Sequence, residues 1–417
     1  MSATLAVRPA ASAPQSSRER LREFATVHRS TTIVVGMLLI TVLMILLPNI
    51  PPLSWIDRVD PWYDVFANAG VFVLLAMGLN VVVGLAGLLD LGYAAFFAIG
   101  AYTYAYSNSP FSGQDLPFLP MLAVGAAVAA VFGIALGAPT LRLRGDYLAI
   151  MTLGFGEIVP IVFLNLDKWT QGTNGISGIF RPEPLPFLGE FTPLSPFGYY
   201  ILMVGIVTVA MILLYRMQDS RIGRAWNAIR EDELAAAANG INTVTTKLLA
   251  FAMGATTAGL AGVFNASKLT IVSPEQFLFA VSFIVLAMVI LGGMGNIWGV
   301  AAGAFAVYLI QVQGLKQLNK IVEGLGIPIL KNINFLDYQF LLFGVALVLM
   351  MLFRPEGLFP SQRRRRELHI AEELAGPVDE DPPIVEDPAS IGALGETPGA
   401  DESFDEAAGK DVPGNDR

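Results

Sequence analysis

The sequence predicts an all-α polytopic membrane protein with about ten transmembrane helices. Hydrophobic residues make up 54% of the 417 residues and charged residues only 15%, whereas roughly a quarter of the residues of a soluble domain are charged. The apolar residues also come in blocks near the roughly 20 residues that a helix needs to cross the hydrocarbon core of a bilayer. Composition and block length therefore indicate a chain that is embedded in a membrane.

Ten apolar stretches have the length and composition of membrane spans. The spans that begin at 88 and 296 start in glycine-rich sequence, so either could also be a re-entrant segment. The expected spans are 31–50, 63–83, 88–107, 118–139, 146–166, 197–215, 248–266, 277–293, 296–313 and 336–353.

Both ends of the chain are polar and flank the transmembrane domain, which we place at 31–360. Residues 1–30 read as a flexible basic arm, and the span that follows lacks a small-x-small cleavage site, so we expect it to stay in place. Residues 361–417 form an Arg-rich flank and an acidic tail that we expect to be disordered. The four arginines at 363–366 suit anionic headgroups and a stop-transfer flank equally well.

The distribution of charge predicts the orientation of the spans. Residues 367–417 contain 15 acidic and two basic residues, a net charge of −13, so the chain's net charge of −9 comes from the tail and the remaining residues carry a net +4. With ten crossings, 17 Lys and Arg residues fall on the side of the termini and seven on the other side. Basic residues favour the cytoplasmic side, so we expect both termini and the 216–247 loop to be cytoplasmic.

The chain lacks the residues that several kinds of catalytic and metal-binding site require. The chain has no cysteine, and both histidines lie outside the spans, which excludes disulfides, thiolate nucleophiles and a buried histidine metal site. The only Gly-Lys pair, Gly409-Lys410, is followed by Asp411 and does not form a phosphate-binding loop. We therefore predict a chain that is not an enzyme, has no catalytic or metal site and binds no cofactor.

The longest polar stretch between spans that also favours a helix is 216–247. Helix-forming residues fill 224–239, and Gly240 stands where a C-cap glycine belongs. A modest apolar stripe is formed by Ile222, Trp226, Ile229 and Ala236. This pattern suits a docking surface, and it suits equally a connector that lies in the headgroup region.

The loop 167–196, on the opposite side, is rich in proline and glycine. This composition breaks long helices, so we expect an ordered irregular cap or a short hairpin.

Ionisable residues are scarce inside the spans. Glu157 lies near the middle of the fifth span, and Asp90 lies at the start of the third. A carboxylate at such depth is costly unless it is paired, neutral or facing a wet cavity, so Glu157 is either a functional group or a hydrogen-bonding partner of a neighbouring helix. For Asn80, Asn265 and Asn296 we expect a role between helices, although they occupy similar depths.

Glycines cluster where helices are expected to approach closely. Two of these clusters, 87–92 and 295–299, each open into a helix rich in alanine, which suggests either an internal repeat or a chance likeness. Close packing explains most of the glycines, and broken helix ends are the alternative.

The combination of these motifs resembles the LivM-type permeases of branched-chain amino acid ABC importers. The resemblance covers about 71–360 and is most specific at 223–241 followed by 247–251, where Glu233, the alanines after it and Gly240 are similar to the pattern with which importer permeases dock their ATPases. Further similar stretches are 87–102, 143–157, 172–178, 290–299 and 354–359.

This resemblance implies the ABC importer permease fold and a multi-pass protein of the bacterial cytoplasmic membrane. It also implies a LivH-type permease partner, two cytoplasmic ATPase subunits that bind ATP and Mg, an external amino-acid-binding protein and membrane lipid, with no nucleic acid. The residues it assigns to ATPase coupling are Arg224, Ala228, Ile229, Arg230, Glu231, Asp232, Glu233, Ala236, Ala237 and Gly240. Candidates for the translocation path are Asn80, Asp90, Glu157 and Asn296.

Two alternatives stay open from the sequence. Family members also carry urea and short amides, so the substrate is a branched-chain amino acid or one of these. A different class of protein, an ion-coupled secondary transporter, would use Glu157 and Asp90 as a proton relay.

Overall fold

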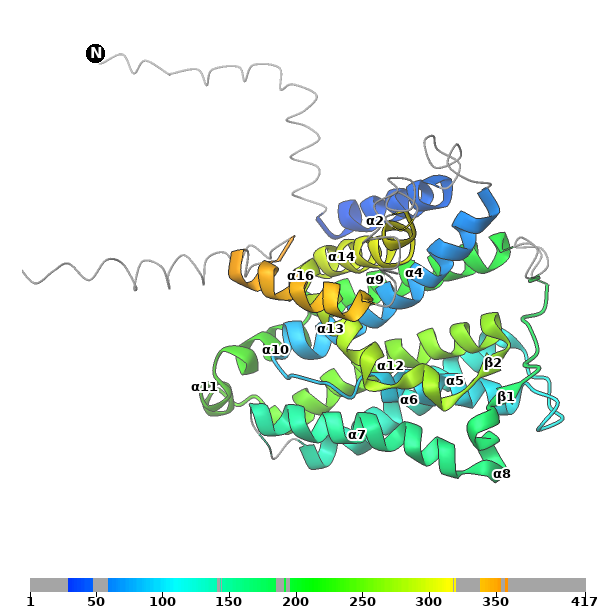
Figure 1. The fold of residues 1–417 in the computed structure, drawn as a ribbon. Coiled ribbons are helices and arrows are strands. Elements are labelled where there is room, and N and C mark those ends of the chain that lie inside the picture. Colours follow the sequence, from blue (N-terminus) through cyan, green and yellow to red (C-terminus); the bar gives the residue numbers. More distant parts are fainter. Residues whose placement is uncertain are drawn as a thin grey trace, which may run out of the picture. The chain divides into compact units, whose positions relative to one another are not determined.

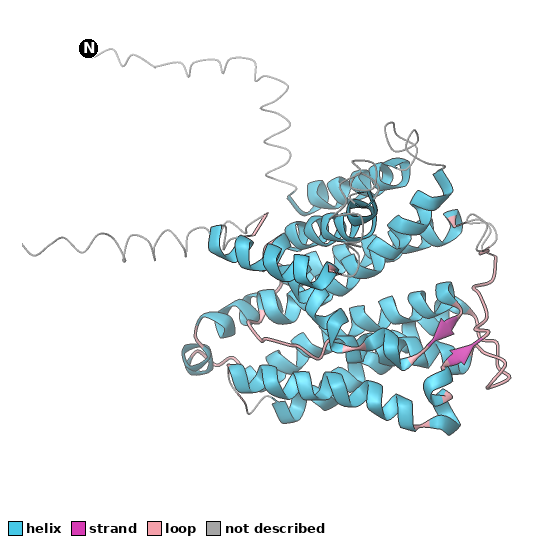
Figure 2. Cartoon of the chain, viewed as in Figure 1, coloured by secondary structure: helices cyan, strands magenta, loops and turns pink. Residues whose placement is uncertain are grey.

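The computed structural model is almost entirely helical (Figures 1 and 2). Each of the ten expected spans overlaps a helix. The structure describes residues 29–47, 59–140, 143, 145–184, 191–192, 196–317, 319, 338–353 and 357–358. The predictions for the arm at 1–28 and for the tail beyond 360 lie outside the described residues.

Seven helical stretches of the described residues are long and apolar enough to cross a membrane. They are built on α4 (Val59–Leu79), α6 (Phe118–Thr140), α7 (Asp146–Asn165), α9 (Phe197–Gln218), α12 (Thr243–Leu269), α13 (Phe279–Gly292) and α14 (Ile297–Leu309). The other expected spans correspond to α2 (Arg29–Leu46), α5 (Ala94–Ser107) and α16 (Gln339–Phe353). Ten crossings therefore remain a prediction.

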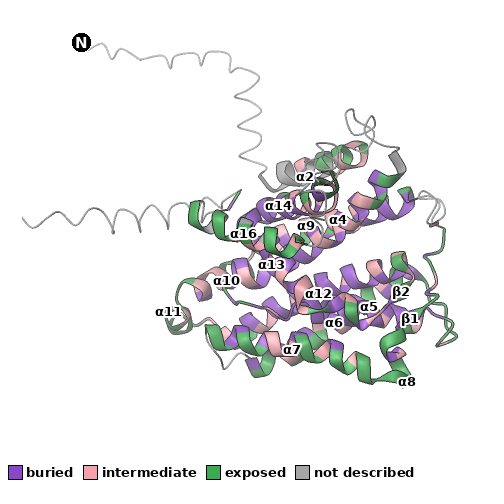
Figure 3. Cartoon of the chain, viewed as in Figure 1, coloured by how far each residue is buried: buried purple, intermediate pink, exposed green. Residues whose placement is uncertain are grey.

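Helices α4 and α12 form the centre of the bundle (Figure 3). Buried residues make up 78% of the apolar stretch of α4 and 67% of that of α12, but only 28% of those of α6 and α7. Helix α12 packs against α4, α5 and α6, and α4 also packs against α9, α13 and α14. Helices α4 and α12 therefore hold the core, while α6 and α7 lie at the periphery of the bundle.

Glycines let the central helices touch through their backbones. A Cβ atom at Gly100 of α5 would lie 2.4 Å from the carbonyl oxygen of Gly259 on α12, and one at Gly262 would lie 2.3 Å from that of Phe97. In the same way, a Cβ atom at Gly303 of α14 would lie 2.3 Å from the Cα atom of Gly292 on α13. Small residues at such crossings allow the close approach that drives helix packing in membranes.

The loop after α7 forms an ordered cap. It contains α8 (Asp167–Thr170), the 3-10 turn η3 (Gly172–Asn174) and the strand β1 (Ile176–Ser177). Strand β1 pairs antiparallel with β2 (Ile271–Val272), which follows α12, so that Ile176 lies opposite Val272 (Figure 2). The described stretch 167–184 of this loop is therefore ordered, as predicted, and β1 pairs with a distant segment of the chain rather than within a hairpin of its own loop.

An ion pair ties α4 to α12 near this end of the bundle. Lys268 Nζ lies 2.8 Å from Asp64 Oδ1 and donates to Asn68 Oδ1 at 2.6 Å. The Lys268 side chain is almost fully buried, whereas that of Asp64 is half exposed. At the opposite end lie the helices of the 216–247 loop (Figure 1).

Candidate functional site

The first helix of the 216–247 loop, α10 (Arg221–Glu231), is fixed to the body of the protein by its apolar side. Ser220 caps its start by accepting hydrogen bonds from the backbone of Ile222 and Gly223. Trp226 is buried, and its indole Nε1 donates to the carbonyl oxygen of Thr246 at the start of α12 over 2.8 Å. Of the four residues in the predicted apolar stripe, three are buried against the body of the protein, namely Trp226, Ile229 and Ala236. The fourth, Ile222, is exposed, so the prediction is wrong for this residue.

The expected single helix over 224–239 is broken at Asp232, and a second helix, α11 (Glu233–Ala238), follows the break. Asp232 has extended backbone angles, and its Oδ1 accepts from the backbone nitrogens of Leu234 at 2.8 Å and Ala235 at 3.0 Å. An aspartate in this position is a strong N-cap, because it satisfies amide groups that the first helical turn leaves without partners. The sequence did not reveal this N-cap, because residues that favour helix stand on both sides of Asp232 and predict one continuous helix.

Gly240 ends α11 in the left-handed conformation that the sequence predicts. Its φ is +82°, and the backbone nitrogens of Gly240 and Ile241 donate to the carbonyls of Ala237 and Ala236. This arrangement satisfies carbonyl groups at the end of the helix and turns the chain toward α12.

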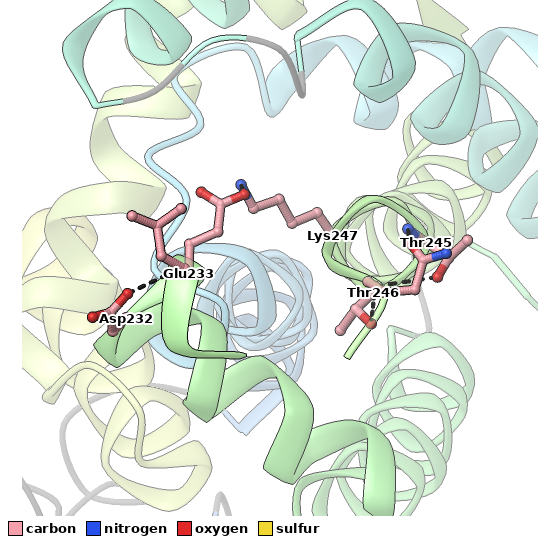
Figure 4. A network of polar contacts seen from close by, with 7 residues as sticks. Asp232, Glu233, Thr245, Thr246 and Lys247 are labelled. Atoms are coloured by element: carbon pink, nitrogen blue, oxygen red, sulfur yellow. Dashed lines mark hydrogen bonds and ion pairs between the residues drawn. The ribbon is translucent and has the colours of Figure 1, made fainter. Parts of the chain in front are cut away.

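Glu233 and Lys247 form an ion pair between α11 and α12 (Figure 4). Glu233 Oε1 lies 2.6 Å from Lys247 Nζ, and the side chains are 25% and 5% exposed, respectively. The pair fixes the orientation of the short helix α11, because a nearly buried ammonium group needs the carboxylate as its partner. The pairing with Lys247 has no signal in the sequence, where the two residues are 14 positions apart.

The surface of α10 and α11 that faces away from the bundle combines acidic and apolar side chains. Leu234 is 67% exposed, and Glu231 and Asp232, which precede it along the chain, are exposed as well. Ala237 is exposed on the same helix, whereas Ala228 is half-buried. Arg224 is exposed as well and donates to the carbonyl oxygen of Asp219 at 3.0 Å. This docking surface, by which we mean the exposed residues of 224–240, offers one large apolar side chain in a charged rim.

Arg230 points into the bundle and contacts the end of α4. Its Nη1 donates to the carbonyl oxygen of Gly84 over 2.6 Å. Gly84 belongs to η2 (Asn80–Leu85), a π-helical turn that ends α4 and is followed by Gly87 at φ +71°. A Cβ atom at Gly87 would lie 2.7 Å from Arg230 Cγ, so glycine is needed there for the close approach as well as for the turn. Arg230, which the resemblance assigns to ATPase coupling, is therefore turned toward η2, and its part in coupling stays a prediction.

A second glycine turn meets η2 directly. Asn80 Oδ1 accepts from the backbone nitrogen of Gly295 at 2.8 Å, and Gln218 at the end of α9 donates from Nε2 to the carbonyl oxygen of Gly295 at 3.3 Å. In this turn, Asn296 Oδ1 accepts from the nitrogen of Trp298 at 3.2 Å and caps α14. Asn80 and the Asn296 turn, both translocation-path candidates, therefore lie together.

Asp90, in the first glycine turn (87–92), accepts a hydrogen bond two residues along the chain as Asn296 does, but it caps no helix, because α5 begins at Ala94. Its Oδ1 accepts from the nitrogen of Gly92 at 2.9 Å, two residues further along the chain. Asp90 is 1% exposed, and its Oδ2 has no hydrogen-bond partner within the described residues. The two turns share this one hydrogen bond, and the suggested internal repeat stays a prediction.

Glu157 lies on the outward face of α7, directly after Gly156, which packs against Gly92 in the turn of Asp90. The residues around it on this face include Met151, Ile158 and Ile161, which are 41%, 52% and 53% exposed. Of the two sequence interpretations of Glu157, a hydrogen bond to a neighbouring helix has no counterpart among the described contacts. The face is therefore apolar with one carboxyl group near its middle.

A cavity of about 250 Å³ lies between the docking helices, the first glycine turn and the start of α7. Its charged lining residues are Asp146, Arg230, Glu233 and Lys247, and its apolar ones are Ala86, Leu88, Leu89, Leu143, Leu148 and Ile229. Within the described part of the chain, no group of three His, Cys, Asp or Glu side chains is placed to hold a metal ion.

Comparison with known proteins gives consistent matches over most of the chain. Residues 63–351 match the family model described as the permease component of the branched-chain amino acid transport system. The chain is 40% identical over 326 residues to the high-affinity branched-chain amino acid transport system permease protein LivM of Salmonella typhimurium, covering 73% of this chain and 71% of that protein.

More distant relatives extend the comparison. A probable branched-chain amino acid transport permease protein LivM of Methanocaldococcus jannaschii is 26% identical, covering 70% of this chain and 91% of that protein. The ribose import permease protein RbsC of Escherichia coli is 25% identical, covering 66% and 81%. No solved structure matches the chain.

Proposed function

Since the chain belongs to the family of permease components of branched-chain amino acid transport systems, we propose that it is the LivM-type permease subunit of an ATP-driven importer. The substrates are leucine, isoleucine and valine, and the membrane is the bacterial cytoplasmic membrane. The observation that carries this proposal is the 40% identity to a LivM protein over 73% of the chain. The ribose permease at 25% identity indicates that the wider family serves other solutes, so the substrate follows from the more similar relatives.

The docking surface of α10 and α11 binds a cytoplasmic ATPase subunit in this proposal. Leu234 is the exposed apolar side chain that a groove of the ATPase would bury, and Glu231 and Asp232 offer charges to its rim. Trp226 and the Glu233–Lys247 ion pair hold both helices against α12, so a force on the surface reaches the transmembrane bundle. ATP and Mg belong to the two ATPase subunits, and this chain contributes no catalytic group.

The outward face of α7 packs against a second permease subunit of the LivH type. A carboxyl group near the middle of a span is costly to expose to lipid, so the face around Glu157 needs a protein neighbour or a water-filled path. A substrate path between two permease subunits would give Glu157 both a protein neighbour and contact with water. Glu157 would then face the substrate path, while Asn80, Asp90 and Asn296 hold the glycine turns that shape the helices beside it.

The cap formed by α8, η3 and β1 faces the external amino-acid-binding protein. It lies at the end of α12 that is remote from the docking surface, as expected if ten crossings place both termini and the docking surface in the cytoplasm.

Reconstitution tests the proposed function. Proteoliposomes that contain the complete assembly, with ATPases facing an ATP-filled lumen, are expected to take up labelled leucine when the binding protein is outside. Vesicles with this chain alone, or with a proton gradient and no ATPase, should take up none; uptake under either condition would favour the ion-coupled transporter. Competition by valine but not by urea or acetamide would support the substrate class, and the reverse would contradict it.

A further inference from the structure

A second cavity, of about 210 Å³, lies between α2, α4, α9 and α14, on the side of the bundle away from α7 (Figure 1). Its lining is apolar, and no charged side chain of the described residues contributes to it. Four of the lining residues are methionines, namely Met37, Met44, Met203 and Met211. Methionine side chains are flexible and fill irregular spaces, so this lining suits an apolar ligand that has no fixed shape.

The three hydroxyl groups in the lining already bond to one another or to helix carbonyls. Thr41 of α2 and Thr208 of α9 share a hydrogen bond of 2.8 Å between their Oγ1 atoms. Tyr200 of α9 donates to the carbonyl oxygen of Met44 on α2. An amino acid in this cavity would lose the hydration of its two charged groups and gain no charged partner, so the cavity does not suit the substrate of an amino acid importer.

The position of this cavity places it beside the hydrocarbon core of the membrane. Gly70 and Thr208, which line it, stand near the middle of α4 and α9. The lining residues Ile40 of α2 and Ala302 of α14 are exposed, whereas Phe66 of α4 is buried, so the cavity leads inward from the surface of the bundle. Protein interiors rarely contain voids larger than a water molecule, and an apolar cavity of ~150 Å³ excludes water and admits a benzene-sized molecule. Hydrocarbon from the surrounding lipid therefore has both access and room.

We propose that this cavity binds one acyl chain of a membrane phospholipid, and that the chain completes the packing of α2 against the bundle. Helix α2 packs against α9, and the cavity lies between α2 and α14. The other neighbour in the membrane is the second permease subunit, which we assign to the outward face of α7. Helix α7 packs against α5 and α6, on the other side of the bundle (Figure 1). The proposal requires only that the chain spans a membrane, and it is independent of the substrate and of the energy source.

Photo-crosslinking of the complete assembly tests the acyl-chain site. Vesicles of phosphatidylethanolamine and phosphatidylglycerol contain a trace of a phospholipid with a diazirine in the middle of one acyl chain, and mass spectrometry identifies the labelled residues. Label is expected on Phe66 and Met203, which line the cavity and are 3% and 1% exposed. The same phospholipid with the diazirine in its headgroup is expected to label neither. Mid-chain label confined to exposed residues such as Val209 and Leu213 would overturn the site.

Variants that fill the cavity distinguish bound lipid from general contact with the bilayer. Ala302→Phe places a ring at the exposed end of the cavity and is expected to lower the labelling of Phe66 and Met203 severalfold. Val207→Phe fills the space from α9 and serves if the first variant fails to assemble. The matched control is Val209→Phe, an exposed change on α9 outside the cavity, which should leave the labelling unchanged. Equal labelling in wild type and in the cavity variants would overturn the proposal.

The remaining alternative is that a side chain of the second permease subunit occupies the cavity. In that case Phe66 and Met203 would be labelled when this chain is reconstituted by itself but not in the complete assembly, and this result would overturn an acyl chain as the occupant. Labelling in both preparations supports the proposal. Size-exclusion chromatography of each variant confirms that the compared assemblies are intact.

Discussion

Arg230 of α10 donates a hydrogen bond from Nη1 to the carbonyl oxygen of Gly84, 2.6 Å away, at the end of α4. Gly84 lies in the π-helical turn η2, and the same turn carries Asn80, which accepts from the backbone nitrogen of Gly295. Gln218, where α9 ends just before the docking helices, donates to the carbonyl oxygen of Gly295. Arg230 and Gln218 thus hold η2 and the second glycine turn, and Asn80 joins these two to each other.

Replacing Arg230 by alanine is expected to separate ATP hydrolysis from transport. Loss of this charge-assisted hydrogen bond should weaken the link between the docking helices and α4, and lower the amount of leucine moved per ATP hydrolysed about tenfold. Recovery of the ATPase with the detergent-solubilised chain should stay normal. Arg230→Lys should retain part of the coupling, and Arg221→Ala all of it; equal coupling in wild type and Arg230→Ala would contradict the link.

The Glu233–Lys247 ion pair is expected to respond unequally to removal of its two members. Glu233→Ala leaves the 5% exposed ammonium of Lys247 without its partner and should lower the stability by about 2–3 kcal/mol, whereas Lys247→Met leaves a carboxylate that is 25% exposed and should cost only about 1 kcal/mol. The midpoint of thermal unfolding of the purified chain in detergent measures the difference. A larger loss for Lys247→Met would contradict the burial argument, and the double variant gives the coupling energy.

Gly240→Val is expected to weaken association with the ATPase. The space around Gly240 is open, but its φ of +82° strains any residue with a branched Cβ, so the end of α11 should rearrange. Pull-down of the ATPase by the solubilised variant measures the effect. Gly240→Asn is the matched control, because asparagine tolerates the left-handed region. Unchanged recovery with valine would count against a docking role for this end of α11.

Glu157→Gln is expected to preserve assembly of the complex and to slow uptake. The substitution keeps the shape of the side chain on the outward face of α7 and removes the charge that we assign to the substrate path. Uptake of labelled leucine, with assembly checked by size-exclusion chromatography, measures the effect. Glu157→Asp should retain more activity than the Gln variant, and normal uptake in the Gln variant would leave the residue a structural role at most.

The sequence predicts the helical elements well because each apolar span carries its own signal. The positions of α6, α7 and α9 follow from block length alone, and Gly240 follows from the stereochemistry of glycine at a helix end. Pairings between distant residues carry no such local signal. The direction of Arg230 toward Gly84 and the Glu233–Lys247 ion pair depend on which helices meet, which only the packing of the bundle decides.

The break at Asp232 is an intermediate case. The aspartate is a recognisable N-cap, but the surrounding Ala, Glu and Leu residues favour one continuous helix, and local hydrogen bonds decide between the two. The outward position of Glu157 could not be predicted either, because α7 shows no clear polar face and its apolar residues surround the helix.

Helix α12 is held at both ends, by Trp226 at its start and by the strand pair β1–β2 just beyond its end. At the start of the helix, Trp226 donates a hydrogen bond to the carbonyl oxygen of Thr246. Three residues beyond its end, Val272 pairs with Ile176 in the two-stranded sheet. A helix of 27 residues is about 40 Å long and bends little. A displacement of α10 by the ATPase would therefore be transmitted along α12 as a rigid element. The segment that follows α7 would then move together with the docking helices, at the opposite end of the bundle.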